Sequence, residues 1–254
     1  MSLLSQALNI SLRKMLTDRT WAGAEVFDQP VDPLAKVLRE GGQEPVPAIA
    51  VYCDETSGTP TGRETQGGLQ SVSMHVFAYM PPTGIKVPDG SAQLGPDQAG
   101  IALNMLGRQI DAAMHFGHQE WIDLWRRFVP MVKNKKSRFV LLEIESGARI
   151  PTLELTYELS CVEEPTFGKP LYGAWVQFDE MMRRTPDGTI IADYFKVAIE
   201  NPSDIPDFEQ FRANFALTWS ELETTGFAPV MIDATPVLQG VSLVEPGEDN
   251  PDGG

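Results

Sequence analysis

Cysteine is scarce in this chain, which has two, Cys53 and Cys161, among 254 residues. Two distant cysteines are too few for the disulfide scaffold of a small secreted protein, and they lack the spacing of metal ligands. We therefore expect two buried free thiols. A single bridge between them stays open, because it depends on whether their strands lie side by side.

Histidine is almost as rare, with three residues. His115 and His118 are three residues apart, a spacing that could place two imidazoles on one helical face, as metal sites require. The sequence indicates no third metal ligand, and Gly117 lies between the two histidines. A polar junction between two helices is therefore the simpler interpretation.

The third histidine, His75, shares one face of a predicted strand with Ser71 and Ser73. A catalytic triad would also need an acid and a nucleophile elbow, and neither is visible in the sequence. The glycine-rich stretch 55–68 lacks the lysine and the following helix of a phosphate-binding loop. We predict no catalytic, cofactor-binding or metal-binding residues, and no enzymatic activity. A small hydrolase or other enzyme is the alternative from a different class, and a binding module is a further alternative.

Basic residues are outnumbered, because 35 acidic residues face 20 lysines and arginines and give a net charge of −15. The imbalance is strongest in residues 165–254, which hold 15 acids and 5 bases. Such a chain repels phosphate backbones, so tight nucleic-acid binding is not expected. A surface past which DNA moves without sticking would suit this charge.

Long apolar runs are also missing. No stretch reaches the roughly 18 residues of a membrane span. The N-terminus has no charged segment followed by a continuous apolar run, so we expect no signal peptide. These observations predict a soluble protein that is made in a cytoplasm and does not bind a membrane.

Hydrophobic periodicity predicts helices and strands along the first two thirds of the chain. Helices are predicted at 2–16, 33–40, 97–116 and 119–132, and strands at 24–28, 46–54, 69–80, 138–145 and 149–162. Two long loops, 55–68 and 83–96, separate them. The strand at 149–162 alternates apolar residues with residues such as Thr152 and Glu154, which predicts one wet face. Because strands come in pairs and helices separately, the fold class is α+β, a mainly antiparallel sheet with flanking helices.

Residues 165–254 differ from the preceding residues in their sequence pattern and form a predicted C-terminal α/β extension. Short elements at 171–182 and 189–200 precede a predicted helix at 207–224. The last ten residues are polar, acidic and rich in turn formers. We therefore predict three regions, an α+β domain at 1–164, an accessory region at 165–244 and a disordered tail at 245–254, and we expect residues 1–164 to fold alone.

The order of elements in residues 1–165 resembles that of phage tail terminator proteins, such as the lambda-type minor tail protein. The matching features are the strand sequence Val-Pro-Ala-Ile-Ala-Val-Tyr at 46–52, the polar loop 55–68, the alternating strand 70–81 that ends at proline, the helix start at 96–99 and the closing strand 153–159. Residues 165–254 lie beyond the resemblance.

The resemblance implies a structural protein of the virion without catalytic residues. It implies a hexameric ring that caps the head-proximal end of the tail tube, stops tube polymerisation and provides the surface for head or neck attachment. The implied partners are further copies of the chain, the tail tube protein, a head-completion or neck protein and, in contractile tails, the sheath. DNA would pass through the lumen without specific binding. Another neck, collar or tail-completion protein is the alternative.

Interface residues are predicted from the exposed loop 55–68 and from the one basic run, 126–138. They are Thr59, Arg63, Glu64, Arg126, Arg127, Lys135 and Lys136. The basic run is interpreted either as a solvated helix end and loop or as a surface complementary to an acidic patch on a neighbouring subunit.

Overall fold

The computed structural model describes residues 2–28, 46–58, 68–81, 85–86, 93–143, 149–166, 168–186 and 188–200. These residues belong to one compact unit, Met1–Leu217. Their elements are α1 (Leu3–Leu16), β1 (Val26–Phe27), β2 (Ala48–Gly58), β3 (Gln70–Tyr79), β4 (Ile85–Lys86), β5 (Gln93–Leu94), a 3₁₀ turn (Pro96–Gln98), α3 (Ala99–Phe116), α4 (Gln119–Phe128), β6 (Met131–Glu143), β7 (Arg149–Cys161), α5 (Ala174–Arg183) and α6 (Gly188–Glu200). The predicted helices at 33–40 and 207–224 and the tail at 245–254 lie outside the described residues.

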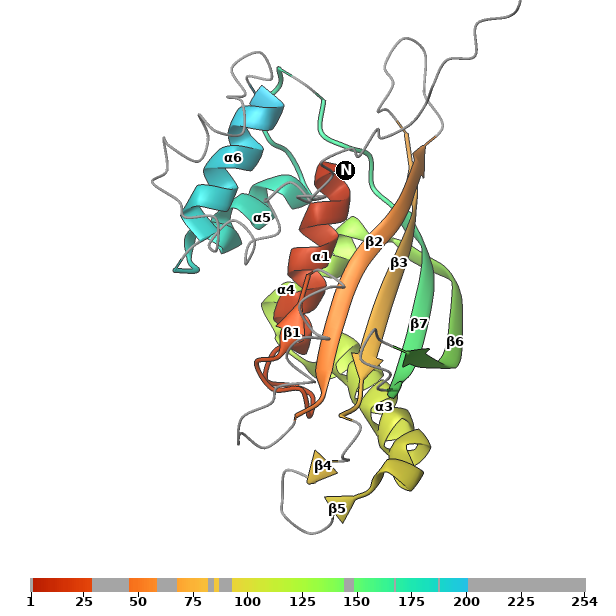
Figure 1. The fold of residues 1–254 in the computed structure, drawn as a ribbon. Helices are drawn as coiled ribbons and strands as arrows, with labels where there is room; N and C mark the ends of the chain where they lie inside the picture. The colour runs from red at the N-terminus through yellow and green to blue at the C-terminus, as the bar shows by residue number, and fades with distance from the viewer. Residues whose placement is uncertain are drawn as a thin grey trace, which may run out of the picture. The chain divides into compact units, whose positions relative to one another are not determined.

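The centre of the fold is a five-stranded sheet in the order β1-β2-β3-β7-β6 (Figure 1). Neighbouring strands are antiparallel except for the short parallel pair β1 and β2. The predicted α+β class with a mainly antiparallel sheet is confirmed. No helix in the described part of the chain is long and apolar enough to span a membrane.

The first helix, α1, begins where the sequence predicts. The Ser2 hydroxyl caps it by accepting a hydrogen bond from the backbone N–H of Ser5, which satisfies a donor that has no partner within the helix. The predicted apolar face is buried, and Leu4, Leu8 and Leu12 have no exposed surface. This face packs against β2 and against α4.

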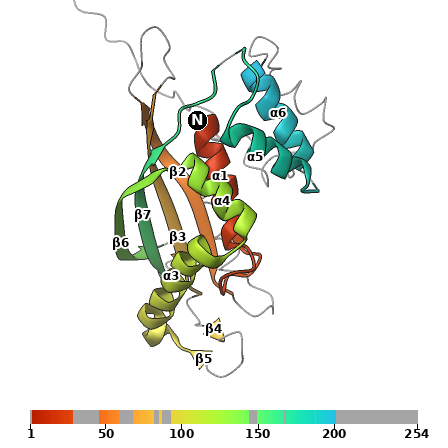
Figure 2. The ribbon, with the colours of Figure 1, turned by 180° about the vertical axis from the view of Figure 1, so that it is seen from behind.

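Helices α1 and α3 cover one face of the sheet, and α4 packs on α1 (Figure 2). α3 crosses β7 and β3, and it comes closest at Gly107, where a Cβ atom would lie 2.8 Å from a methyl carbon of Leu153. The sequence of this helix offers Ile101, Leu103, Leu106 and Ile110 for one apolar stripe. The last three are buried, but Ile101 is 58% exposed. Ile101 lies in the first turn, on the side of the helix that faces away from the sheet.

The opposite face of the sheet has a smaller apolar cluster. Ala48, Ala50, Tyr79 and Ile150 are buried there, with Phe77 packed against them. The side chains of Tyr52, His75, Phe77 and Tyr79 form a row of nearly parallel rings whose centroids are 5.2 to 6.2 Å apart.

An aromatic cluster connects the helices after β7 to α4. The ring of Phe128, fully buried at the end of α4, lies 5.0 Å from Trp175 and 6.1 Å from Phe178, both on α5. Phe195 of α6 lies 5.1 Å from Phe178. Of the predicted extension, the structure therefore describes two helices, and the predicted boundary at 164 falls within the unit that includes them.

Two predicted loops contain strand residues. β2 continues to Gly58, where the sequence predicts a loop from residue 55, and it stays paired with β3 to that point. The sequence predicts a helix at 119–132 that bends or ends near Pro130, and α4 ends at Phe128, two residues before this proline. β6 begins at Met131, whereas the sequence predicts a strand only from residue 138. Residues 55–58 and 133–138 are polar on both faces of their strands, so neither segment shows the alternation by which a strand is recognised. The predicted loop 83–96 likewise contains the short β4–β5 pair.

Both cysteines are free; Cys161 is buried as predicted, whereas Cys53 is only half-buried. They lie on β2 and β7, which are separated by β3, so the bridge that the sequence left open is not formed. Burial raises the pKa of the Cys161 thiol to about 12, and burial also raises that of Cys53 well above its usual range. Only the thiolate is an effective nucleophile.

We therefore expect both thiols of the native protein to react slowly with a thiol-specific reagent at pH 7 to 8 and quickly in denaturant. Mass spectrometry of the labelled protein measures each site. Fast labelling of Cys161 without denaturant would contradict the burial described above.

Candidate interaction surface

The last strand of the sheet, β6, is the most exposed strand in the described structure. It pairs only with β7, so the N–H and C=O groups along its outer edge have no strand partner among the described residues. Its side chains are exposed on both faces from Met131 to Phe139. Four large apolar side chains of β6 have exposed fractions of 48 to 56%: Met131, Val132, Phe139 and Leu141. A long, open and partly apolar edge is a template for pairing with another chain.

Two predicted interface residues, Lys135 and Lys136, lie on opposite faces of β6. Lys135 forms an ion pair with Asp111 of α3, and its Nζ lies 5.5 Å from the centroid of the Tyr157 ring. Lys136 reaches across the other face, where its Nζ is 3.0 Å from a Glu158 oxygen. This hydrogen bond and the lysine charge hold the pKa of Glu158 below its ordinary value.

The other two described candidates, Arg126 and Arg127, lie on α4. Arg126 is 4.0 Å from Asp123 within the same helix and is exposed. Arg127 lines an open hollow of about 690 Å³ together with Leu69, Tyr172 and Trp175. The basic run is therefore divided among three places: α4, the helix-covered face of the sheet and the opposite face.

The remaining candidates, Thr59, Arg63 and Glu64, lie outside the described residues. Gly58 is the last residue of β2 before them, and Gly68 follows them with a φ of 89°. This left-handed conformation favours glycine. Gly58 is paired with Gln70, so the described ends of this segment lie close together.

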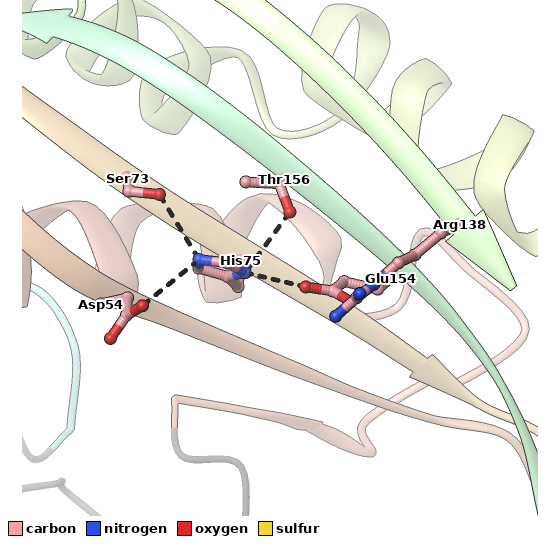
Figure 3. A network of polar contacts seen from close by, with 6 residues as sticks. All are labelled: Asp54, Ser73, His75, Arg138, Glu154 and Thr156. Atoms are coloured by element: carbon pink, nitrogen blue, oxygen red, sulfur yellow. Dashed lines mark hydrogen bonds and ion pairs between the residues drawn. The ribbon is translucent and has the colours of Figure 1, made fainter. Parts of the chain in front are cut away.

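A polar row crosses the open face of the sheet and connects four strands (Figure 3). It begins at Asp54 on β2, whose carboxylate is 3.8 Å from His75 Nε2 on β3. His75 Nδ1 lies 3.2 Å from Glu154 Oε1 on β7. Arg138 on β6 donates from Nε to the other oxygen of Glu154. The row therefore ends in a carboxylate at one side of the sheet and a guanidinium at the other.

Glu154 is the buried centre of this row, with 5% of its surface exposed. Burial by itself raises the pKa of its carboxyl group, but the hydrogen bonds and charges of Arg138 and His75 outweigh burial and lower the pKa below its ordinary value. The prediction that Glu154 lies on a wet face is wrong for this reason: the side chains of Arg138 and His75 lie against it. Thr152, on the same face, is fully buried as well.

The contacts of His75 include the acid that a catalytic triad would need. His75 Nε2 is 3.4 Å from the Ser73 hydroxyl, opposite the contact with Glu154. Two observations count against catalysis. The Glu154 carboxylate is already neutralised by Arg138, and Ser73 and His75 lie two residues apart on one regular strand, which offers no elbow to present the hydroxyl.

The other two histidines do not converge on a common ligand position. His115 Nδ1 lies 2.8 Å from the backbone carbonyl of Asp111, and His118 Nε2 lies 3.4 Å from that of Thr17. No group of three or more metal-ligating side chains occurs in the residues that the structure describes. The geometry matches the predicted polar junction, since His118 immediately precedes α4.

No family model matches the chain, and no curated protein matches it.

Sequence reasoning placed His75 and Glu154 on polar strand faces but did not connect them. They are 79 residues apart, and their contact depends on the register in which β3 pairs with β7. The exposed edge of β6 was missed for a related reason: the sequence does not say which strand is last in the sheet. The sequence signal that could have indicated it is a run of polar and charged residues, 133–138, on both faces of a strand, which is typical of sheet edges.

Proposed function

We propose that this protein is a non-enzymatic structural protein of a phage virion, a tail terminator. Its copies form a hexameric ring that caps the head-proximal end of the tail tube, stops tube polymerisation and provides the surface for head or neck attachment. The proposal starts from the resemblance in the order of elements over residues 1–165.

The observation that carries the assembly part of the proposal is the open edge of β6. Exposed apolar side chains and unpaired backbone groups occur together along 13 residues. Soluble proteins blunt such an edge with charged side chains, as Lys133, Lys135, Lys136 and Arg138 do in the middle of β6, but the large apolar side chains toward its two ends stay exposed. In a protein that acts by self-assembly, this open edge can bind the next copy. A closed ring buries the edge of every copy without forming open fibres.

The partners follow from the same proposal. They are further copies of this chain, the tail tube protein, a head-completion or neck protein and, in contractile tails, the sheath. The protein is made in the host cytoplasm and becomes part of the virion tail or neck. Its net charge of −15 would let DNA pass through the lumen without binding.

Negative-stain electron microscopy tests this function. We expect the purified protein to form sixfold rings, or to cap one end of polymerised tail tubes after mixing. Tubes assembled in its presence should stop at that cap. Particles that remain monomeric at high concentration and bind to neither end of the tubes would contradict the proposal.

The segment between β2 and β3 gives a second test. Replacing residues 59–67 by a short Gly/Ser linker should leave folding intact, because Gly58 and Gln70 already pair across the base of the hairpin. We expect the variant to lose capping of tubes. Thermal unfolding and tube-capping assays measure the two effects separately.

A triple substitution of Thr59, Arg63 and Glu64 by serine is the matched control, because it keeps the length of the segment. Loss of capping in this variant would assign the role to those side chains. Normal capping by the linker variant would show that the segment has no part in assembly.

A neck or tail-completion protein is the second candidate. The observation in its favour is the pair α5 and α6, which lies beyond the resemblance; the first residues of α5, Ala174 and Trp175, line the hollow together with Tyr172. Binding to the neck without binding to tubes would favour this alternative.

A further inference from the structure

The sheet has a second open edge besides β6. On its other side, β1 pairs only with Ile49 and Ala50 of β2. Residues 51–58 of β2 pair with β3 on one side and have no strand partner on the other in the described part of the chain. Among the described residues, the sheet therefore presents two unpaired edges on opposite sides, and a head-to-tail contact between identical copies joins two such different edges.

The strand directions of these two edges are compatible. β3 is antiparallel to both β2 and β7, and β6 is antiparallel to β7, so β6 and β2 run in opposite directions. A second copy rotated about an axis along the strands keeps these directions. Its β2 would then lie antiparallel to β6 of the first copy, and the antiparallel order of the sheet would continue across the contact.

The charges at the two edges are complementary. On the open face, Lys136 and Arg138 of β6 have exposed side-chain fractions of 68% and 73%, and each forms an ion pair with a glutamate of β7. At the other edge, the Asp54 side chain is 68% exposed. The polar row in Figure 3 thus ends in opposite charges, and a copy placed edge to edge would extend it from Arg138 or Lys136 to Asp54.

We propose that β6 of one copy pairs antiparallel with residues 51–58 of β2 in the next copy, with Lys136 facing Asp54. This inference rests on the proposed ring and names the contact that builds it. In this register Phe139 lies opposite Val51 and Val132 opposite Gly58, so two exposed apolar side chains of β6 enter the contact. The pairing covers about 26 Å of strand and ends where β1 takes over the edge of β2.

Site-directed disulfides test the contact directly. Within one chain, residues 54 and 136 are separated by β3 and β7, a distance of about 14 Å, which exceeds the reach of a disulfide. In a Cys53→Ala background, we combine Asp54→Cys with Lys136→Cys. After mild oxidation we expect a ladder of covalent multimers on a non-reducing gel, ending at the number of copies in the ring.

Five further samples define the result. Asp54→Cys alone and Lys136→Cys alone should give no ladder, while a mixture of the two single variants should give only a dimer. Asp54→Cys with Lys135→Cys should not crosslink, because Lys135 points to the other face. Asp54→Cys with Asn134→Cys tests a pairing of β6 with β2 that is shifted by two residues. Such a shift has to be tested because β2 has a register irregularity between Cys53 and Glu55, and β6 has one between Val132 and Asn134.

Charge exchange provides a test that needs no new cysteine. Asp54→Lys and Lys136→Glu should each raise the concentration for half-maximal assembly by about tenfold or more, because like charges would face each other. The double variant should restore assembly. Circular dichroism of each variant establishes that the monomer is folded.

The outcomes separate this inference from the proposed function. Rings without crosslinking from position 54 to either 134 or 136, and without rescue by the charge exchange, would overturn the edge contact and leave the terminator proposal in place. Crosslinked multimers that do not cap tubes would support the edge contact and contradict the terminator function. A folded protein that stays monomeric would overturn both.

Discussion

Replacing Phe128 by alanine is expected to lower the free energy of unfolding by about 3 to 5 kcal/mol. Phe128 is fully buried, and its ring meets the edges of Trp175 and Phe178 at interplanar angles of 69° and 70°. The substitution leaves a cavity between α4 and α5 that the surrounding rings fill only in part. Denaturant unfolding followed by circular dichroism measures the change.

Phe116→Ala is the matched control, because Phe116 ends the neighbouring helix α3 and is 84% exposed. We expect it to change stability by about 0.5 kcal/mol or less. Similar losses for both variants would show that the aromatic cluster is not a main contribution to the core.

The same contact changes what we expect of a truncation after residue 164. The sequence predicts that residues 1–164 fold alone. In the structure, that truncation removes the two rings that lie against Phe128. It keeps Glu164, whose carboxylate accepts a hydrogen bond from the backbone N–H of Leu4 at the start of α1. We expect a folded but less stable fragment that aggregates through the exposed Phe128, and a truncation as stable as the full chain would contradict the packing.

Glu154→Gln should destabilise the protein by about 1 to 3 kcal/mol at pH 7. The variant keeps the size of the side chain but removes the buried charge that both Arg138 and His75 contact. Glu158→Gln is the control on the same strand and face, where an exposed pair with Lys136 should matter far less.

The pH dependence gives this prediction its sign. Because the pKa of Glu154 is lowered in the folded protein, its contribution to stability is fully present above the ordinary glutamate pKa of about 4.3 and is lost as the pH falls through the lower, folded value. The difference between the parent and Glu154→Gln should therefore shrink in acid. A constant difference from pH 7 down to pH 3 would mean that the charge of Glu154 is not what stabilises the fold.

The contact between Phe128 and Trp175 shows where sequence reasoning stopped. Periodicity was enough to predict α1, because a helix of this kind exposes one side to solvent and buries the other. It also predicted β3 and the pairing of two strands around residues 144–148. It gave no sign that a ring at the end of α4 is covered by a helix that follows β7, since that contact joins segments 47 residues apart.

The interface candidates show a second limit. Charge and loop composition selected Lys135 and Lys136 from the basic run, but they could not separate the two faces on which these side chains lie. The two side chains lie on opposite faces because residues 131–143 form a strand. The sequence does not reveal this strand clearly, because an edge strand that is exposed to solvent on both faces shows no alternation of apolar and polar residues.

By itself, the sequence determined the α+β class, the main helices and strands of residues 2–164 and the acidic balance of charge. These depend on local periodicity and on composition, which need no knowledge of distant contacts. Only the tertiary structure decided the order of strands, and with it the two open edges of the sheet and the row from Asp54 to Arg138. Strand order and register are set by which distant segments pair, and backbone pairing of this kind leaves little trace in the local pattern of side chains.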